Sequence, residues 1–307
     1  MRLMEAIPNF SEGRRPEVVD RIAAAFRRPD VFLLDQEMDA THNRAVITAV
    51  GDPNALRQAC LDACAVACEL IDLTRHQGEH PRMGATDVIP FVPLAGTTSE
   101  DAVSVARQLA GEIWQRLAIP TYLYEDAAHD PNRRLLPAIR KGGFEALRDG
   151  AIREAGRLPD VGGPDVHPTA GVTAVGARKP LVAFNVNLAT TDLELGKRIA
   201  RAVRESSGGL PKVRAMAVDM RESGRVQVSM NLTDTDTTPI FQAYEFVAQA
   251  AAAEGVAVAE SEVIGLVGLG ALADVAKSAL QVGAFSTGQV LENKLLAVLS
   301  EQTHEAS

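Results

Sequence analysis

The chain is poor in aromatic residues and cysteine, and it has no excess of basic residues. Aromatic side chains make up 4% of its 307 residues, with a single Trp, so aliphatic side chains must fill the core. The net charge of −9 leaves no basic surface of the kind that binds a nucleic-acid backbone. Nucleic acid is therefore excluded as an expected partner.

Long apolar runs are also missing. Glu5 and Pro8 interrupt the stretch where a signal peptide needs continuous apolar residues, and no later segment reaches the length of a membrane span. We therefore expect a cytoplasmic protein without a membrane partner. Cys60, Cys64 and Cys68 recur every four residues, which on a helix gives one apolar stripe. Small buried thiols fit this stripe better than a zinc cluster, and free thiols are typical of a reducing compartment.

Hydrophobic residues at 46% and charged residues at 23% are typical of a globular protein, and the length suits two domains. Apolar spacing in the first half predicts strand, helix, strand, strand, helix, strand. The segments are 3–9, 16–26, 31–37, 44–51, 53–73 and 87–94, followed by a helix at 99–117 and an apolar run at 120–124. This is a βαββαβ order.

The second half repeats this order without a clear residue-level repeat. Its segments are 181–188, 191–206, 213–220, 225–232, 239–254 and 256–263, with further helices at 271–280 and 289–299. Residues 159–176, rich in Gly and Pro, are expected to form a loop between the halves. The sequence thus predicts an α+β protein of two tandem ferredoxin-like subdomains, 1–178 and 179–307. Each has an antiparallel or mixed sheet with helices on one face, and we expect the active cleft between them.

The densest polar cluster is residues 75–84, Arg-His-Gln-Gly-Glu-His-Pro-Arg-Met-Gly. Pro81 disfavours helical geometry at His80, and the flanking glycines permit sharp turns. An imidazole in such a loop suits proton transfer near neutral pH. We expect His80 to be a general acid and base; a merely structural polar loop is the alternative.

A second alternative for this loop is a zinc site. His76 to His80 spells His-x-x-Glu-His, the spacing of inverted zinc peptidases. That motif requires both histidines on one helical face, whereas Gly78 weakens a helix and Pro81 ends it. No third ligand follows in an obvious position, so we expect no metal.

Residues 35–44 form a second polar cluster between two expected strands. Its acids alternate, so they share one face if the strand continues through Asp39. A solvated hairpin is the ordinary interpretation. Beside the histidine loop, Asp39 and Glu37 would instead attract a cationic group, and Arg44 or Arg82 would bind a substrate carboxylate.

Taken together, several motifs resemble those of the formiminotransferase family, which forms glutamate in histidine breakdown. They span both halves: Pro8–Gly13, Asp35–Arg44, Arg75–Gly84, Gly176–Lys179, Ala183–Leu188, Gln227–Asp234 and Ser261–Leu266.

The resemblance implies a homodimer that moves the formimino group from N-formimino-L-glutamate to N5 of tetrahydrofolate, its co-substrate. It places the catalytic histidine on His80. It places the folate-contacting segment on Gly162, Gly163, Pro164, Asp165, Val166, His167, Pro168, Thr169, Ala170 and Gly171. Two alternatives share the same fold. One is a non-catalytic folate-binding protein, and the other is a paralogue that handles 5-formyltetrahydrofolate or formylglutamate.

Overall fold

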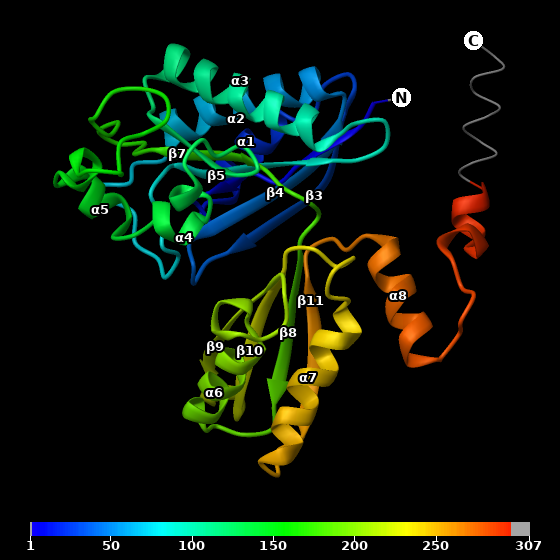
Figure 1. Cartoon of the computed structure of the whole chain (residues 1–307). Coiled ribbons are helices and arrows are strands. Elements are labelled where there is room, and N and C mark those ends of the chain that lie inside the picture. The colour runs from blue at the N-terminus through cyan, green and yellow to red at the C-terminus, as the bar shows by residue number, and fades with distance from the viewer. Residues whose placement is uncertain (1, 296–307) are drawn as a thin grey trace. The chain divides into compact units, whose positions relative to one another are not determined.

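A computed structural model describes residues 2–295 of the chain. The chain divides into two compact units, the first ending at Lys179 and the second beginning at Pro180 (Figure 1). Each unit has its own sheet and its own hydrophobic core. The units are therefore described separately.

Within the described residues, the first unit contains a seven-stranded sheet. Its strands are β1 (Met4–Ala6), β2 (Asn9–Phe10), β3 (Val31–Asp39), β4 (Arg44–Gly51), β5 (Thr86–Pro93), β6 (Thr121–Glu125) and β7 (Thr173–Ala177). β1 and β2 are two parts of one extended segment, and both pair antiparallel with β4 and β5. β3 pairs antiparallel with β4, so the core of this sheet has the antiparallel βαββαβ order that the sequence predicts.

Three helices cover one face of this sheet: α1 (Pro16–Ala24), α2 (Pro53–Leu70) and α3 (Ser99–Leu117) (Figure 1). Asp52 caps α2 by accepting from two backbone amides, and Thr98 starts α3 with a reciprocal capping box. Cys60 and Cys64 are buried in this core on α2, as the apolar stripe predicts. Helix α2 ends at Leu70 and leads directly into residues 71–85, the histidine loop, so the packing of α2 determines where that loop begins.

Two features of the first unit differ from the expected elements. The first strand is divided at Ile7 and Pro8 because proline has no amide hydrogen to donate to a neighbouring strand. The expected loop 159–176 ends in a strand, because Thr173–Ala177 forms β7 parallel to β5 and β6. β7 is buried on both faces, so it lacks the alternation that marks a half-exposed strand.

Strands β6 and β7 carry a second, smaller core on the face that points away from helices α1, α2 and α3. Short helices α4 (Leu136–Ile139) and α5 (Gly143–Arg148) supply Ile139 and Leu147 to it. These pack with Tyr122 and Tyr124, whose neighbour Leu123 faces the main core. The insertion between β6 and β7 therefore brings a helical segment, and with it Arg140, to this face.

The second unit has a four-stranded antiparallel sheet in the order β11-β8-β10-β9. Its strands are β8 (Val182–Leu188), β9 (Val213–Met220), β10 (Arg225–Leu232) and β11 (Val258–Ile264), and its helices are α6 (Leu193–Val203), α7 (Ile240–Ala253) and α8 (Leu269–Ala279). The first strand of the repeat again lies between the third and the fourth. Alternate residues of β8 and β10 form the core under α6 and α7.

The C-terminal region agrees with the expected helices as far as it is described. Helix α8 covers most of the expected segment 271–280, and residues 291–295 are helical. The remainder of the expected helix 289–299 lies outside the described residues. Among the helices of residues 2–295, none combines the length and the apolar character that crossing a bilayer requires.

Candidate active site around His80

The histidine loop, residues 71–85, is irregular backbone between α2 and β5, and the turn between β3 and β4 holds it in place. Asn43 accepts from the Gly13 amide at 2.9 Å and donates to the carbonyl of Gln77 at 2.9 Å. His76 Nε2 lies 3.0 Å from the Asn43 carbonyl. The backbone amide of His80 donates to the carbonyl of His42 at 3.3 Å. Two polar segments that the sequence separates by more than thirty residues are therefore one structural unit.

His80 contacts a buried carboxylate. Its Nε2 lies 3.2 Å from Asp87 Oδ2, and Asp87 also accepts from the Met83 amide at 2.8 Å and from the guanidinium of Arg140. The side chain of Asp87 is 0% exposed and that of His80 is 5% exposed. A ring with so little exposed surface can present only one edge to a substrate.

The charge of Asp87 decides which nitrogen of His80 carries the proton. Burial by itself would raise the pKa of Asp87, but Arg140, His80 and the Met83 amide outweigh it and lower the pKa to about 2. An ionised carboxylate only accepts hydrogen bonds, so Nε2 of His80 is the protonated nitrogen. In the neutral ring, Nδ1 then keeps its lone pair and is the nitrogen available as a base.

Three of the four residues expected to hold the substrate lie on β3 and β4. Asp39 pairs with Arg44 across the two strands, and Glu37 lies two residues earlier on β3. Asp39 accepts from the His42 amide at 2.9 Å and lies 2.7 Å from His42 Nδ1. Burial by itself would raise the pKa of Asp39, but these contacts outweigh it and lower the pKa.

Arg44 connects this cluster electrostatically to the site of His80. Burial, followed by the positive charge of Arg140, lowers the pKa of Arg44. The carboxylates of Asp39, Glu37 and Asp87 each act to raise the pKa of Arg44. Arg44 Nε is buried and has no hydrogen-bond partner in the described part of the chain, a property that it shares with the Nε atoms of Arg82 and Arg140.

Arg82 has a different environment. Its guanidinium forms a two-point contact with Glu145, at 2.7 and 3.2 Å, and donates to the carbonyl of His76 at 3.1 Å. These bonds connect the histidine loop to α5. A role for Arg82 in substrate binding stays a prediction, because in this structure its hydrogen-bonding edge faces protein acceptors.

The end of the expected folate segment packs against the histidine loop. The Leu73 amide donates to the carbonyl of Thr169 at 2.8 Å, and the Ala85 amide donates to the carbonyl of Ala170 at 2.9 Å. Gly171 has a φ of +70°, and a Cβ there would lie 2.2 Å from the Met83 carbonyl oxygen. Glycine is therefore required where the segment meets the loop.

The middle of the segment is organised by His167. Its Nδ1 accepts from the Ala170 amide at 3.0 Å, and its backbone exchanges two hydrogen bonds with Gly171. Burial lowers the pKa of His167. Gly162, with a φ of +103°, lies against Trp114 at the other end of the segment. The segment is thus a defined turn rather than an open linker.

Two cavities are lined in part by the histidine loop and the folate segment, and neither is lined by His80. One of about 420 Å³ is lined by Asn43, Arg75 and His76 together with residues of the N-terminal turn before α1. One of about 460 Å³ is lined by Asp165, Val166 and Pro168 of the folate segment together with Arg148 and Arg153. Both volumes are in the range of small-molecule sites.

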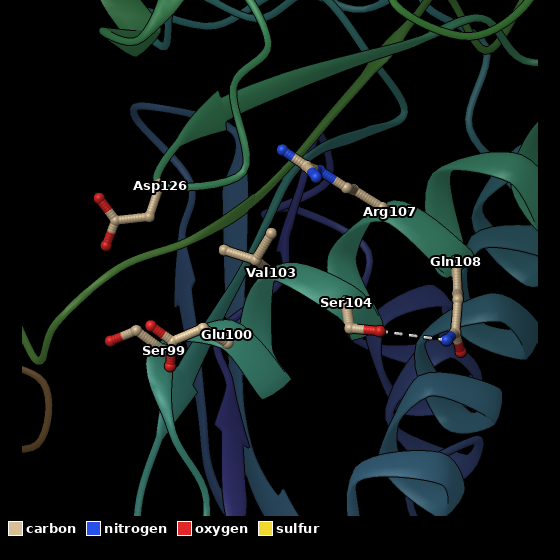
Figure 2. Close-up of a pocket in the computed structure, with 7 residues that line it drawn as sticks. All are labelled: Ser99, Glu100, Val103, Ser104, Arg107, Gln108 and Asp126. Carbon is tan, nitrogen blue, oxygen red and sulfur yellow. Dashed lines mark hydrogen bonds between the residues drawn. The ribbon is translucent and has the colours of Figure 1, made fainter.

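A further cavity of about 680 Å³ lies over α3 and Asp126, and Figure 2 shows its lining residues. Ser104 there accepts from Gln108 at 3.3 Å. Its lining residues are Ser99, Glu100, Val103, Ser104, Arg107, Gln108 and Asp126, and the sequence analysis assigns a function to none of them. We assign it no role in the site of His80.

The geometry does not form the helical zinc motif. Residues 76–80 are irregular, and the Nε2 atoms of His76 and His80 contact different partners, Asn43 and Asp87. Over residues 2–295, no group of three or more His, Cys, Asp or Glu side chains is arranged to hold a metal ion. The spacing alone was the reason to consider zinc, and the spacing depends on a helix that is not there.

The sequence analysis does not identify two residues of this site. It predicts Asp87 only as the first residue of a strand. An acid at the start of an otherwise apolar strand, seven residues after His80, was the available signal. Arg140 follows α4 in a region without clear periodicity, and no local signal marks it.

Comparisons with known proteins agree with the resemblance. The N-terminal subdomain of the formiminotransferase domain matches residues 3–178, and the formiminotransferase domain matches residues 183–297. Glutamate formimidoyltransferase of Thermoplasma acidophilum is 48% identical over 96% of this chain and 98% of its own length. The enzyme of the same name from Streptococcus pyogenes is 45% identical over 96% of this chain and 99% of its own.

A longer relative matches over part of its length. Formimidoyltransferase-cyclodeaminase of Gallus gallus is 42% identical over 90% of this chain, which spans 52% of that protein. Two domain models that together match most of the chain, and relatives at this identity over nearly full length, establish the family. The chain belongs to the formiminotransferase family.

Proposed function

We propose that this chain is a glutamate formimidoyltransferase. It transfers the formimino group of N-formimino-L-glutamate to N5 of tetrahydrofolate, giving 5-formiminotetrahydrofolate and L-glutamate in histidine breakdown. The observation that carries the proposal is the similarity to two glutamate formimidoyltransferases over nearly the full length of both chains, and the contact of His80 with ionised Asp87 supports the chemistry. The proposal includes the homodimer, the cytoplasmic location and the two subdomains, 1–178 and 179–307, expected from the sequence.

The reaction needs proton transfer and positioning rather than an enzyme nucleophile. The amidine carbon of the donor is electrophilic, so N5 can attack it directly. The bond from N5 to that carbon forms, the bond from the carbon to the glutamate nitrogen breaks, and one proton passes from N5 to the departing nitrogen. Two substrates held in contact and one group that shuttles the proton are sufficient.

We assign both proton transfers to His80, because its contact with Asp87 leaves Nδ1 as the nitrogen with a free lone pair. Nδ1 accepts the proton from N5, and the imidazolium then donates it to the glutamate nitrogen. Asp87 holds the ring through Nε2 and stabilises the positive charge that the ring acquires between the two transfers. Arg140 keeps Asp87 ionised, so its action on His80 is indirect.

We propose that Asp39 and Glu37 face the cationic amidine and that Arg44 binds a substrate carboxylate. The register that places Arg44 opposite Asp39, with Glu37 two residues away on the same strand, supports this assignment. Arg82 is the alternative anchor, and it would have to exchange Glu145 for the substrate.

Residues 162–171 are proposed to contact the folate. Two observations support a fit. The segment packs on the histidine loop, and a cavity of about 460 Å³ lies beside it. Arg148 and Arg153 line this cavity but pair with Asp149 and Asp165, so a glutamyl carboxylate of the folate would have to replace one of these acids.

The test is His80→Asn, with His129→Asn as a matched control at an exposed histidine. We expect kcat to fall by about two to four powers of ten in the first variant, with tetrahydrofolate binding retained. The control should keep wild-type turnover. Near-normal turnover in folded His80→Asn would reject the assignment of His80.

The donor must be varied in the same assay. N-formimino-L-glutamate, N-formyl-L-glutamate and 5-formyltetrahydrofolate are supplied separately, and the one-carbon product is identified by its absorbance. Transfer from a formyl donor alone would favour the paralogue. Binding of tetrahydrofolate without any transfer would favour a folate-binding protein.

A further inference from the structure

His167 uses both nitrogens of its ring inside the protein. Nδ1 accepts from the backbone amides of Ala170, at 3.0 Å, and Thr169, at 3.4 Å. Nε2 lies 3.8 Å from the sulfur of Cys68, in the last turn of α2. Because Nδ1 accepts from two amides, the ring proton is on Nε2, which donates to the sulfur. The ring of His167 therefore has a single tautomer and connects the folate segment, residues 162–171, to α2.

The residues whose amides bond to this ring also hold the histidine loop. The carbonyl of Thr169 accepts from the Leu73 amide at 2.8 Å, and the carbonyl of Ala170 accepts from the Ala85 amide at 2.9 Å. Leu73 and Ala85 lie near the two ends of that loop. The Thr169 carbonyl and the Ala170 amide belong to one planar peptide unit. The ring of His167 and the histidine loop thus fix the orientation of this unit from opposite sides.

Burial makes the bond from the Ala170 amide to the ring difficult to replace. Ala170 is 1% exposed, so water has no access with which to substitute for the imidazole. An amide without an acceptor in such a position carries the full cost of its desolvation. Rotation of the peptide unit toward another acceptor would break the bond between the Thr169 carbonyl and Leu73. Loss of the ring is therefore transmitted to the histidine loop.

A thiol beside an imidazole is also the arrangement of a cysteine nucleophile. The hydrogen bonds of His167 do not fit that role, because Nε2 already carries the ring proton and cannot take a second one from the sulfur. Burial raises the pKa of the Cys68 thiol and lowers the pKa of His167, so both groups are neutral near pH 7. The contact between Cys68 and His167 therefore holds the ring in place and does not activate the thiol.

We propose that His167 is a positioning residue for the transferase reaction. This inference rests on the proposed function, in which residues 162–171 contact the folate and His80 moves the protons. By holding the peptide unit between Thr169 and Ala170, the ring of His167 sets the conformation of the folate segment and the place of the histidine loop against it. His167 touches no reacting atom in this assignment, so its effect on turnover is indirect.

The test compares His167→Asn with His167→Gln in the full chain. The side-chain oxygen of Asn is attached where Nδ1 is in histidine, so it can accept from the amides two and three residues later, as in an Asx turn. The longer side chain of Gln places its amide near the former Nε2 and leaves the Ala170 amide without its acceptor. His129→Gln, at an exposed histidine, is the matched control.

Three quantities are measured: the affinity for tetrahydrofolate by calorimetry, kcat, and the rate of hydrogen exchange at the Ala170 amide. In His167→Gln we expect the affinity and kcat each to fall about 10-fold and the amide to exchange about 10-fold faster, because a buried N–H loses its acceptor. His167→Asn and His129→Gln should stay within about threefold of wild type in all three. A variant that is merely less stable would lower the number of tetrahydrofolate sites without changing their affinity, and that result in His167→Gln would overturn the inference.

Equal values for His167→Asn and His167→Gln, whether both are impaired or both are normal, also overturn the inference, because only the Asn variant restores the acceptor. Cys68→Ala removes the partner of Nε2 and keeps the two amide bonds, so its loss of affinity should be smaller than that of His167→Gln. A larger loss would mean that the thiol itself acts, and it would overturn the positioning role. A wild-type chain that binds no tetrahydrofolate, or that transfers no formimino group, counts against the proposed function, whereas hydrogen exchange at Ala170 still tests the inference.

Discussion

Replacing Asp87 by Asn is the sharpest perturbation of the proposed site, because it preserves shape and changes the proton on His80. An amide that turns its NH₂ group toward Nε2 makes that nitrogen an acceptor and moves the ring proton to Nδ1. The nitrogen assigned as the base is then blocked. The same replacement in serine proteases lowers kcat by about four powers of ten. We expect a loss of about two to four powers of ten here.

The same substitution has a stability effect that can be worked out separately. The pKa of Asp87 falls from 3.8 to about 2, so its ionised form contributes roughly 2 kcal/mol to the free energy of unfolding. Because the folded-state pKa is depressed, this contribution is present above pH 3.8 and is lost as the pH falls toward about 2. The difference in unfolding free energy between wild type and variant should shrink over that window.

The assay for Asp87→Asn is the initial rate of 5-formiminotetrahydrofolate formation, with kcat and KM determined for each substrate. Urea unfolding from pH 7 down to about pH 2 gives the stability difference. Asp20→Asn, at an exposed acid on α1, is the control. A kcat within about threefold of wild type in folded Asp87→Asn would refute the positioning role of Asp87.

The remaining predictions concern Arg140 and the loop. Arg140→Met leaves Asp87 buried without its cation, so we expect the free energy of unfolding, measured with urea, to fall by about 3 to 5 kcal/mol. The variant should also unfold in acid at a higher pH than wild type. An unchanged midpoint pH of acid unfolding would contradict the pairing of Arg140 with Asp87. Gly78→Ala places a Cβ 2.4 Å from the His42 carbonyl oxygen and so displaces the histidine loop. We expect kcat to fall by a larger factor than the factor by which KM changes. Gly111→Ala on α3, where nothing lies within 4 Å of the new Cβ, should leave turnover unaffected.

Much of the fold follows from local patterns. The alternation along β8 and β10 and the capped helix α2 are visible in the residues themselves, and both repeats have the strand order that follows from them. β7 was missed because a strand buried on both faces lacks alternation, and its Gly and Thr content suggested a loop. Pro8 was visible, but its effect of dividing the first strand depends on the pairing partners.

The site was predictable to the extent that its residues are contiguous. His80 stood out through its neighbours Gly78, Pro81 and Gly84. Asp87 and Arg140 act on His80 only after β5 and α4 are in place, and the distance between them in sequence conceals the contact. Sequence reasoning therefore identified the imidazole but missed the two charges that set its tautomer.

The position of β7 has a consequence for how the molecule assembles. β7 is inserted between β5 and β6, two strands that precede it in the chain, so it gains its hydrogen bonds only when both neighbours are in register. Because these pairings are non-local, we expect β7 to dock after β5 and β6 have formed. Residues 162–171 immediately precede β7 and reach the histidine loop by the same movement. Folding intermediates that lack this strand would thus be compact yet unable to turn over substrate.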